Sequence, residues 1–292
     1  MASSRSYRLG AGEALPDGIA RIALGRIDHA LDELRGKTDS SAEEAVHEAR
    51  KDMKKLRSLL RLARGELGES VFARENVFFR DTARELAAVR DDDVMLETLD
   101  KLGLPAGEGW ELRKLVQAHR AHGGDGRETA VRGVVAMLRE ARGRVPEWPL
   151  ERDSFDAIAD GLERTYRRGR RDLRTARAEP SVEALHEWRK RVKDLWYHHT
   201  ILRRLWPPVM TAVADEAHDL SNLLGDDHDL GMLADWVRAH ADGSPELFEA
   251  VERRRAALEA DALALGERLY AEKPPAYVRR LGRLWTRTHV RS

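Results

Sequence analysis

The ten residues HEARKDMKKL at positions 47–56 return as HEWRKRVKDL at positions 186–195, with six positions identical. The offset of 139 residues is close to half of the 292-residue chain. Each copy keeps a histidine, an arginine and two lysines at positions i, i+3, i+4 and i+7, and this spacing places the four side chains on one face of an α-helix. We call the two stretches the basic cassettes and predict that they belong to a duplicated helical unit.

The rest of the chain also predicts an all-α protein. Alanine, leucine, arginine and glutamate dominate, β-branched residues are sparse, and no strand pattern is visible. Helical periodicity predicts twelve helices at about 18–35, 43–64, 71–89, 93–102, 109–121, 127–143, 154–178, 182–205, 209–224, 229–241, 245–271 and 275–288. One of the predicted breaks falls at Gly225. We expect two helical bundles related by an internal pseudo-twofold duplication, at 1–145 and 150–292, joined near Pro146–Pro149.

An aspartate-rich stretch is repeated as well. Residues 90–94 (RDDDV) match residues 226–230 (DDHDL) at an offset of 136. Clustered carboxylates suit Mg²⁺ or Ca²⁺, whereas acids at a helix start more often cap backbone N–H groups. We favour capping, and a third alternative is that these acids orient the cations of the cassettes from behind.

A helical wheel separates an apolar and a basic stripe on each cassette helix. The apolar stripes contain Val46, Ala49, Met53 and Leu56 in the first copy and Leu185, Trp188, Val192 and Leu195 in the second. The basic stripes contain His47, Arg50, Lys51, Lys54, Arg57 and Arg61 in the first copy and His186, Arg189, Lys190, Lys193 and Arg204 in the second. Like charges at this spacing repel by ~0.2–0.5 kcal/mol per pair. The stripes are either solvated faces or binding surfaces for an anion, and their repetition favours a phosphate-rich polymer as ligand.

Charge is neutral overall but unevenly distributed. The chain has 51 basic and 51 acidic residues, yet seven arginines lie between positions 164 and 177. There Arg170 and Arg174 border the apolar face, where they either extend the cationic surface or form local ion pairs, while Arg168 is expected to point outward. Cysteine is absent, which excludes disulfides and cysteine-ligated metals. Since no signal peptide or membrane-spanning stretch is visible, we expect a soluble cytoplasmic protein with no membrane partner.

The paired H-E-x-R-K-x-x-K cassettes, the sequence YRRGR at 166–170 and the aspartate-rich stretches together resemble the CHAD domain, the conserved histidine α-helical domain. The resemblance covers about residues 10–290. It implies two helical bundles whose basic central surface binds inorganic polyphosphate, without catalysis, and it suggests association with polyphosphate granules. The binding residues that it implies are His47, Arg50, Lys51, Lys54, Arg57, His186, Arg189, Lys190 and Lys193. Trp196 stands where the first copy has Arg57, so the second stripe is expected to bind less strongly.

A hydrolase is the alternative function. His218-Asp219 and His228-Asp229 are His-Asp pairs, with His198-His199 upstream, and helical metal-dependent phosphohydrolases use such pairs to hold metals that activate water. The first half has no equivalent pair, because Thr82 and Ala83 occupy the matching positions. We therefore favour a non-enzymatic binding protein without metal or cofactor. The tryptophans do not alternate with cations as in base-stacking surfaces, so we expect no specific nucleic-acid partner.

Overall fold

The computed structural model describes residues 5–86, 91–102, 106–120, 127–241 and 243–289. Every regular element in these ranges is a helix, which confirms the all-α prediction there. The α-helices are α1 (Leu15–Leu34), α2 (Ala42–Leu62), α3 (Arg64–Glu85), α4 (Asp91–Leu102), α5 (Ala106–Arg120), α6 (Arg127–Arg144), α7 (Asp156–Ala178), α8 (Val182–Ile201), α9 (Pro207–His240), α10 (Pro245–Leu269) and α11 (Pro274–His289). Short 3₁₀ turns, η3 (Val145–Glu147) and η4 (Arg203–Leu205), follow α6 and α8. No helix in the described ranges is both long and apolar enough to cross a lipid bilayer.

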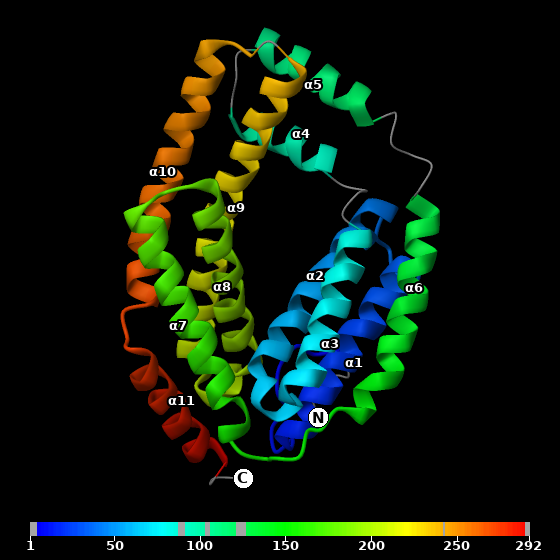
Figure 1. Ribbon diagram of the computed structural model, residues 1–292, viewed down its shortest axis with the longest axis vertical. Helices are drawn as coiled ribbons and strands as arrows, with labels where there is room; N and C mark the ends of the chain where they lie inside the picture. The colour runs from blue at the N-terminus through cyan, green and yellow to red at the C-terminus, as the bar shows by residue number, and fades with distance from the viewer. Residues whose placement is uncertain (1–4, 87–90, 103–105, 121–126, 242, 290–292) are drawn as a thin grey trace.

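Helices from the two halves of the chain form two packed groups that meet at their lower ends (Figure 1). α1, α2, α3 and α6 pack together, and α7, α8, the first part of α9 and α11 form the facing group. One hydrophobic core runs through both groups. Their contact brings α2 and α8, the two cassette helices, side by side.

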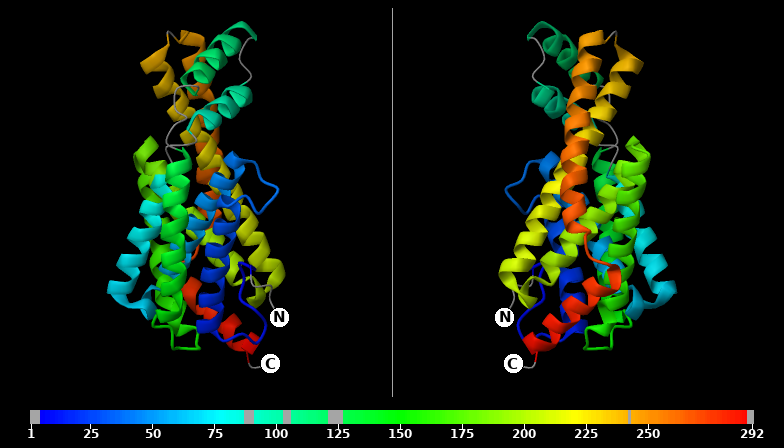
Figure 2. Two further views of the ribbon diagram at one scale, coloured as in Figure 1. Left: turned by 90° about the vertical axis from the view of Figure 1, so that its right-hand side faces the viewer. Right: turned by 90° about the vertical axis from the view of Figure 1, so that its left-hand side faces the viewer.

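The remaining first-half helices, α4 and α5, leave their own group and pack against the far ends of α9 and α10 (Figures 1 and 2). A second apolar cluster joins them, with Leu99 and Val116 from α4 and α5 against Leu233 and Val251 from α9 and α10. The join at Pro146–Pro149 therefore does not separate two independently packed bodies. The internal duplication stays a prediction from sequence.

Each cassette helix begins at a serine cap and buries its apolar stripe. The Ser41 hydroxyl accepts from the Glu44 N–H while the Glu44 carboxylate accepts from the Ser41 N–H, forming a capping box at the start of α2. Ser181 caps α8 in the same place. The predicted apolar stripes are all buried, and burial of each large side chain contributes ~1.5–3 kcal/mol. Because the apolar stripe of each cassette helix packs into the core, its neighbouring basic stripe faces the other half of the chain.

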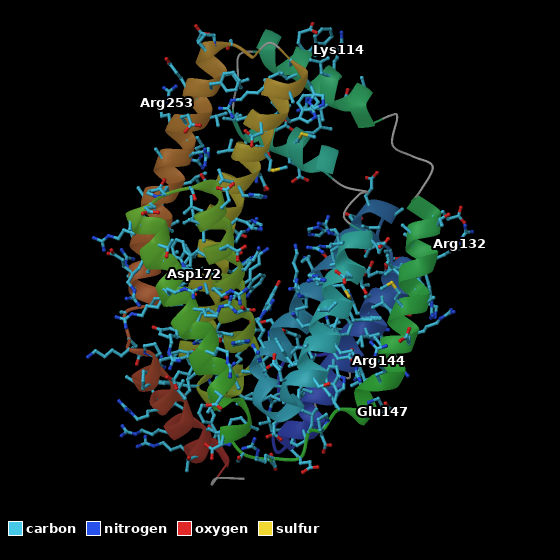
Figure 3. All side chains as sticks on the ribbon, viewed as in Figure 1. Lys114, Arg132, Arg144, Glu147, Asp172 and Arg253 are labelled. Atoms are coloured by element: carbon cyan, nitrogen blue, oxygen red, sulfur yellow. The ribbon has the colours of Figure 1, made fainter. Side chains whose placement is uncertain are left out.

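Close contacts fix the two groups against each other. Gly161 of α7 lies so near α2 that a Cβ atom there would come within 2.0 Å of the Leu62 carbonyl oxygen. The buried His198 ring of α8 hydrogen-bonds the Ser58 carbonyl of α2 at 3.1 Å. Within the first group, Arg144 of α6, labelled in Figure 3, pairs with the fully buried Glu75 of α3. The position of α2 beside α8 is thus set by backbone contact and buried polar bonds.

The break predicted at Gly225 is wrong. α9 is one 34-residue helix that passes through Gly225, so residues 226–229 lie inside a helix. Capping of a helix start, the interpretation favoured for these acids, is therefore also wrong for this copy. The side chains of the matching residues 90–94 lie outside the described part of the chain.

Candidate functional site

A cleft of about 450 Å³ lies between α2 and α3 of the first half and α8 of the second. Its lining contains ten arginine and lysine side chains and, in the described part of the chain, a single carboxylate, that of Asp194. The lining residues are Arg50, Lys54, Arg57, Arg61, Arg80, Ala83, Arg84, His186, Arg189, Lys190, Arg191, Lys193, Asp194 and Tyr197. Eight of the thirteen residues singled out from sequence lie in this cleft, and they come from both cassettes.

The carboxylate in the cleft is already neutralised. Asp194 is 2% exposed and pairs with Arg61 of α2 at 2.9 Å and with Arg191 at 2.9 Å. Burial opposes ionisation of Asp194, but these two arginines hold its pKa below the ordinary value. The Arg61–Asp194 pair also links the two halves at the base of the cleft.

The first cassette helix contains a buried carboxylate of its own. Asp52 is fully buried and pairs with Arg26 at 3.2 Å and with His29 at 2.6 Å, both from α1. Asp52 and Asp194 occupy different positions in the two aligned cassettes. Both carboxylates hold their helices in place by buried ion pairs.

Arg189 is positioned by α9. Its Nε donates to the Ser221 carbonyl at 3.2 Å, and its guanidinium lies over Gly225, where a Cβ atom would come within 2.4 Å of a terminal nitrogen. Burial lowers the pKa of Arg189, and the nearby charges of Asp229 and Asp226 raise it. The third alternative for the aspartate-rich stretch, orientation of cassette cations from behind, thus agrees with the position of these two acids.

Lys193 has an unusual environment in the cleft. Burial lowers its pKa to about 6, and the positive charges of Arg189 and Lys54 lower it in the same direction. Burial and the neighbouring Arg61 similarly lower the pKa of Arg57 to about 10. An anion in the cleft would reduce the repulsion between these basic side chains. It would also replace the water contacts that burial removes from Lys193 and Arg57.

The histidines of the cassettes lie in different surroundings. His186 lines the cleft, and its ring lies tilted against that of His228 of α9 with ring centroids 4.6 Å apart. Burial lowers the pKa of His186 to about 4. His47 is half-buried on α2 but does not line the cleft. The charge of His47 helps to lower the pKa of Glu48.

The other histidines do not converge on one point. His198 bonds the Ser58 carbonyl, His199 bonds the Leu195 carbonyl at 2.9 Å, and His218 stacks on the Trp196 ring. Within the described ranges, no group of three or more histidine or carboxylate side chains is arranged to hold a metal ion. The residues proposed for the hydrolase alternative are therefore distributed over separate local contacts.

Four further predicted residues lie outside the cleft lining. Lys51 pairs with Glu48 at 2.7 Å, yet its charge still acts on Lys193, so it lies near the cleft. Arg204 does not continue the stripe, because α8 ends at Ile201 and Arg204 sits in η4 beside a separate cavity. On α7, Arg170 is half-buried near Tyr166. Arg174 is exposed and donates to the Arg170 carbonyl at 3.3 Å.

Sequence reasoning missed several cations of the site. Arg80 and Arg84 of α3 complete the wall of the cleft, and Arg191 lies at its base. Arg168 is exposed, and its charge still helps to lower the pKa of the partly buried Arg61. The i, i+4 spacing of Arg80 and Arg84 was the available signal, but it lies outside the repeated cassette.

The comparisons with known proteins agree with this architecture. The family model of the CHAD domain matches residues 21–238. The crystal structure of the CHAD domain from the plant Ricinus communis superposes with a TM-score of 0.57 over 90% of this chain and 94% of that one, at 19% sequence identity. A search of curated proteins found no significant match. With three quarters of its length matched by the family model, this chain belongs to the CHAD domain family.

Proposed function

We propose that this protein binds inorganic polyphosphate in the cleft between α2, α3 and α8. The observation behind the proposal is the lining of that cleft: ten arginine and lysine side chains from both halves lie around one carboxylate, and this carboxylate is already paired with Arg61 and Arg191. Arginine supplies planar donor pairs that match phosphate oxygens, and lysine adds mobile point charges. A protein of zero net charge that places ten of its 51 arginines and lysines in one cleft has a local field there that attracts a polyanion.

The dimensions of the cleft favour a thin polymer. A polyphosphate strand is a single file of phosphate groups. A DNA duplex is much wider, with a major groove about 12 Å across, and needs protein contacts spread over an outer surface. Neutralisation of many phosphates releases counterions, so the affinity should fall steeply with salt. The expected partner is therefore polyphosphate, with no specific nucleic acid and no membrane.

We propose that binding is not followed by chemistry. The histidines that suggested a hydrolase have separate partners in the described structure. Release of orthophosphate from polyphosphate by the purified protein with added Mg²⁺ or Mn²⁺ would contradict this and favour the hydrolase. Association with polyphosphate granules in cells follows from the binding proposal and would be tested by imaging the tagged protein.

Equilibrium binding of long-chain polyphosphate, compared with a DNA duplex of matched charge, tests the proposal. The cleft variant is Arg50→Glu/Lys54→Glu/Arg189→Glu/Lys193→Glu. A matched control, Arg253→Glu/Lys273→Glu/Arg279→Glu/Arg283→Glu, makes the same change in net charge at exposed positions, with Arg253 on the outer side of α10 (Figure 3). We expect only the cleft variant to lose polyphosphate binding, by at least a hundredfold if each contact supplies about 1 kcal/mol. Equal losses in both variants would mean that net charge, and not the cleft, determines binding.

A further inference from the structure

Lys193 differs from three other lysines of the cassettes, Lys51, Lys55 and Lys190. Lys51, Lys55 and Lys190 each pair with a carboxylate three residues earlier on the helix, namely Glu48, Asp52 and Glu187. Three residues before Lys193 stands Lys190, a second cation. Within the described structure no hydrogen bond or ion pair joins the Lys193 amino group to a carboxylate.

The charges that face Lys193 favour its uncharged form. Arg189 approaches from its own helix, Lys54 and Lys51 approach from α2, and Asp229 of α9 is the acid that opposes them. The side chain lines the cleft and is shielded from most solvent. A lysine beside other cations in a desolvated pocket keeps a free electron pair at neutral pH, the usual state of a nucleophilic lysine. Its pKa of about 6 agrees with this geometry.

The same cleft would concentrate reagents that carry a phosphate group. Arg50 and Arg189 line it together with Lys193, and guanidinium groups bind phosphate oxygens in pairs. A small electrophile with a phosphate leaving group would thus be held with its reactive carbon near a free amine. Proximity of this kind converts a slow bimolecular reaction into a local one.

We propose that Lys193 is an acylation site that takes acyl groups from small acyl phosphates bound in the cleft. Its amino nitrogen attacks the carbonyl carbon, a C–N bond forms, and the bond from that carbon to the phosphate oxygen breaks. Inorganic phosphate leaves with the electron pair, and the proton lost by the nitrogen passes to phosphate or water. The product is an uncharged amide, and no oxidant or reductant is needed.

Acylation would also affect ligand binding, and this consequence rests on the proposed function. Bound polyphosphate would favour protonation of the Lys193 amine, and the amide prevents this protonation. The acyl group also adds bulk to a cleft of about 450 Å³. Acylated protein is therefore expected to bind polyphosphate about tenfold or more weakly, the effect of losing one charged hydrogen bond of about 1.5 kcal/mol.

Acetyl phosphate and N-acetylimidazole, an acyl donor without phosphate, are the two probes. The full-length protein is incubated with each at pH 7, and acetylation at every lysine is quantified by mass spectrometry. Lys54 is the internal control, since it is the cassette counterpart of Lys193 and lines the same cleft. A lysine with a pKa near 6 is more than about a thousandfold richer in free amine at pH 7 than an ordinary lysine. We expect Lys193 to react at least about tenfold faster than Lys54 with both reagents, after allowance for its lower basicity.

Two variants make the outcomes separable. Arg50→Gln should slow the reaction of Lys193 with acetyl phosphate more than its reaction with N-acetylimidazole, because only the first reagent needs the phosphate anchor. Lys193→Arg should lose the modification while keeping a cation in the cleft. Equal rates at Lys193 and Lys54 with either reagent would overturn the proposal, and so would an acetyl phosphate reaction that is indifferent to Arg50→Gln. Direct titration with polyphosphate in parallel shows separately whether the proposed function fails.

Discussion

The affinity for polyphosphate should fall as the pH rises from 6 to 8, because of Lys193. The empty cleft holds the pKa of this lysine at about 6, mainly through burial and then through Arg189 and Lys54. Phosphate oxygens favour the charged form, so the pKa of Lys193 should return towards its ordinary value of about 10.4 in the complex. A group whose pKa rises on binding takes up a proton. Binding is therefore strongest below the pKa of the free state and weakens as the pH climbs above it.

The magnitude follows from these two pKa values. At pH 7 about nine in ten free molecules have an uncharged Lys193, so about 0.9 proton is taken up per molecule bound. The association constant should fall about fivefold from pH 6 to pH 7 and about ninefold from pH 7 to pH 8. Isothermal titration calorimetry in buffers of different ionisation enthalpy measures the proton uptake directly.

The variant Lys193→Arg provides the control. Its guanidinium stays charged at pH 8, so the pH dependence should largely disappear and binding at pH 8 should exceed that of the wild type. A wild-type affinity that is flat between pH 6 and pH 8, with no proton uptake at pH 7, would refute this description of the cleft. A slope that persists unchanged in Lys193→Arg would assign the titration to another group.

Three substitutions test how the cleft is built. Gly225→Ala should leave α9 as stable as before or stabilise it by up to about 1 kcal/mol, which thermal unfolding measures. Its methyl group should also displace Arg189 and weaken polyphosphate binding about tenfold, which titration measures. Asp194→Asn leaves Arg61 without its buried charged partner and should lower the free energy of unfolding by about 3 kcal/mol. A urea unfolding curve that matches the wild type would contradict the structural role of this pair. Gly161→Ala should destabilise the protein by about 2 kcal/mol in the same assay, because its methyl group meets the backbone of α2, and an unchanged midpoint would mean that α7 can move away freely.

The helical faces of this protein could be predicted from sequence because they depend on local periodicity. Residues such as Met53 and Trp188 fall on the apolar stripes of the wheel and are fully buried. The basic stripes follow from the same geometry, which is why most of the predicted cations face one cleft. Extrapolation failed at Arg204, because the helix stops at Ile201 and the wheel no longer applies.

Features that depend on contacts between distant elements were not visible in the sequence. Gly225 is ordinarily a helix breaker, but α9 continues through it and the missing side chain makes room for Arg189. Arg80 belongs to the site only because α3 packs beside α2. The buried acids Asp52 and Asp194 each pair with an arginine of another helix, but they occupy different positions in the two aligned cassettes. Comparison of the two copies therefore did not reveal this shared structural role.

We expect one polyphosphate chain to contact cations of both halves at the same time. The salt dependence of binding measures this most directly, since the slope of log K against log[salt] decreases in magnitude by about 0.7 for each phosphate contact removed from a single-stranded polyanion. We predict that Arg50→Gln and Arg189→Gln, one from each cassette, each reduce the slope by about 0.7 and that the double variant reduces it by about 1.4. A slope that responds to one of these substitutions but not to the other would show that the ligand binds a single half. That result would contradict binding of one chain across both cassettes.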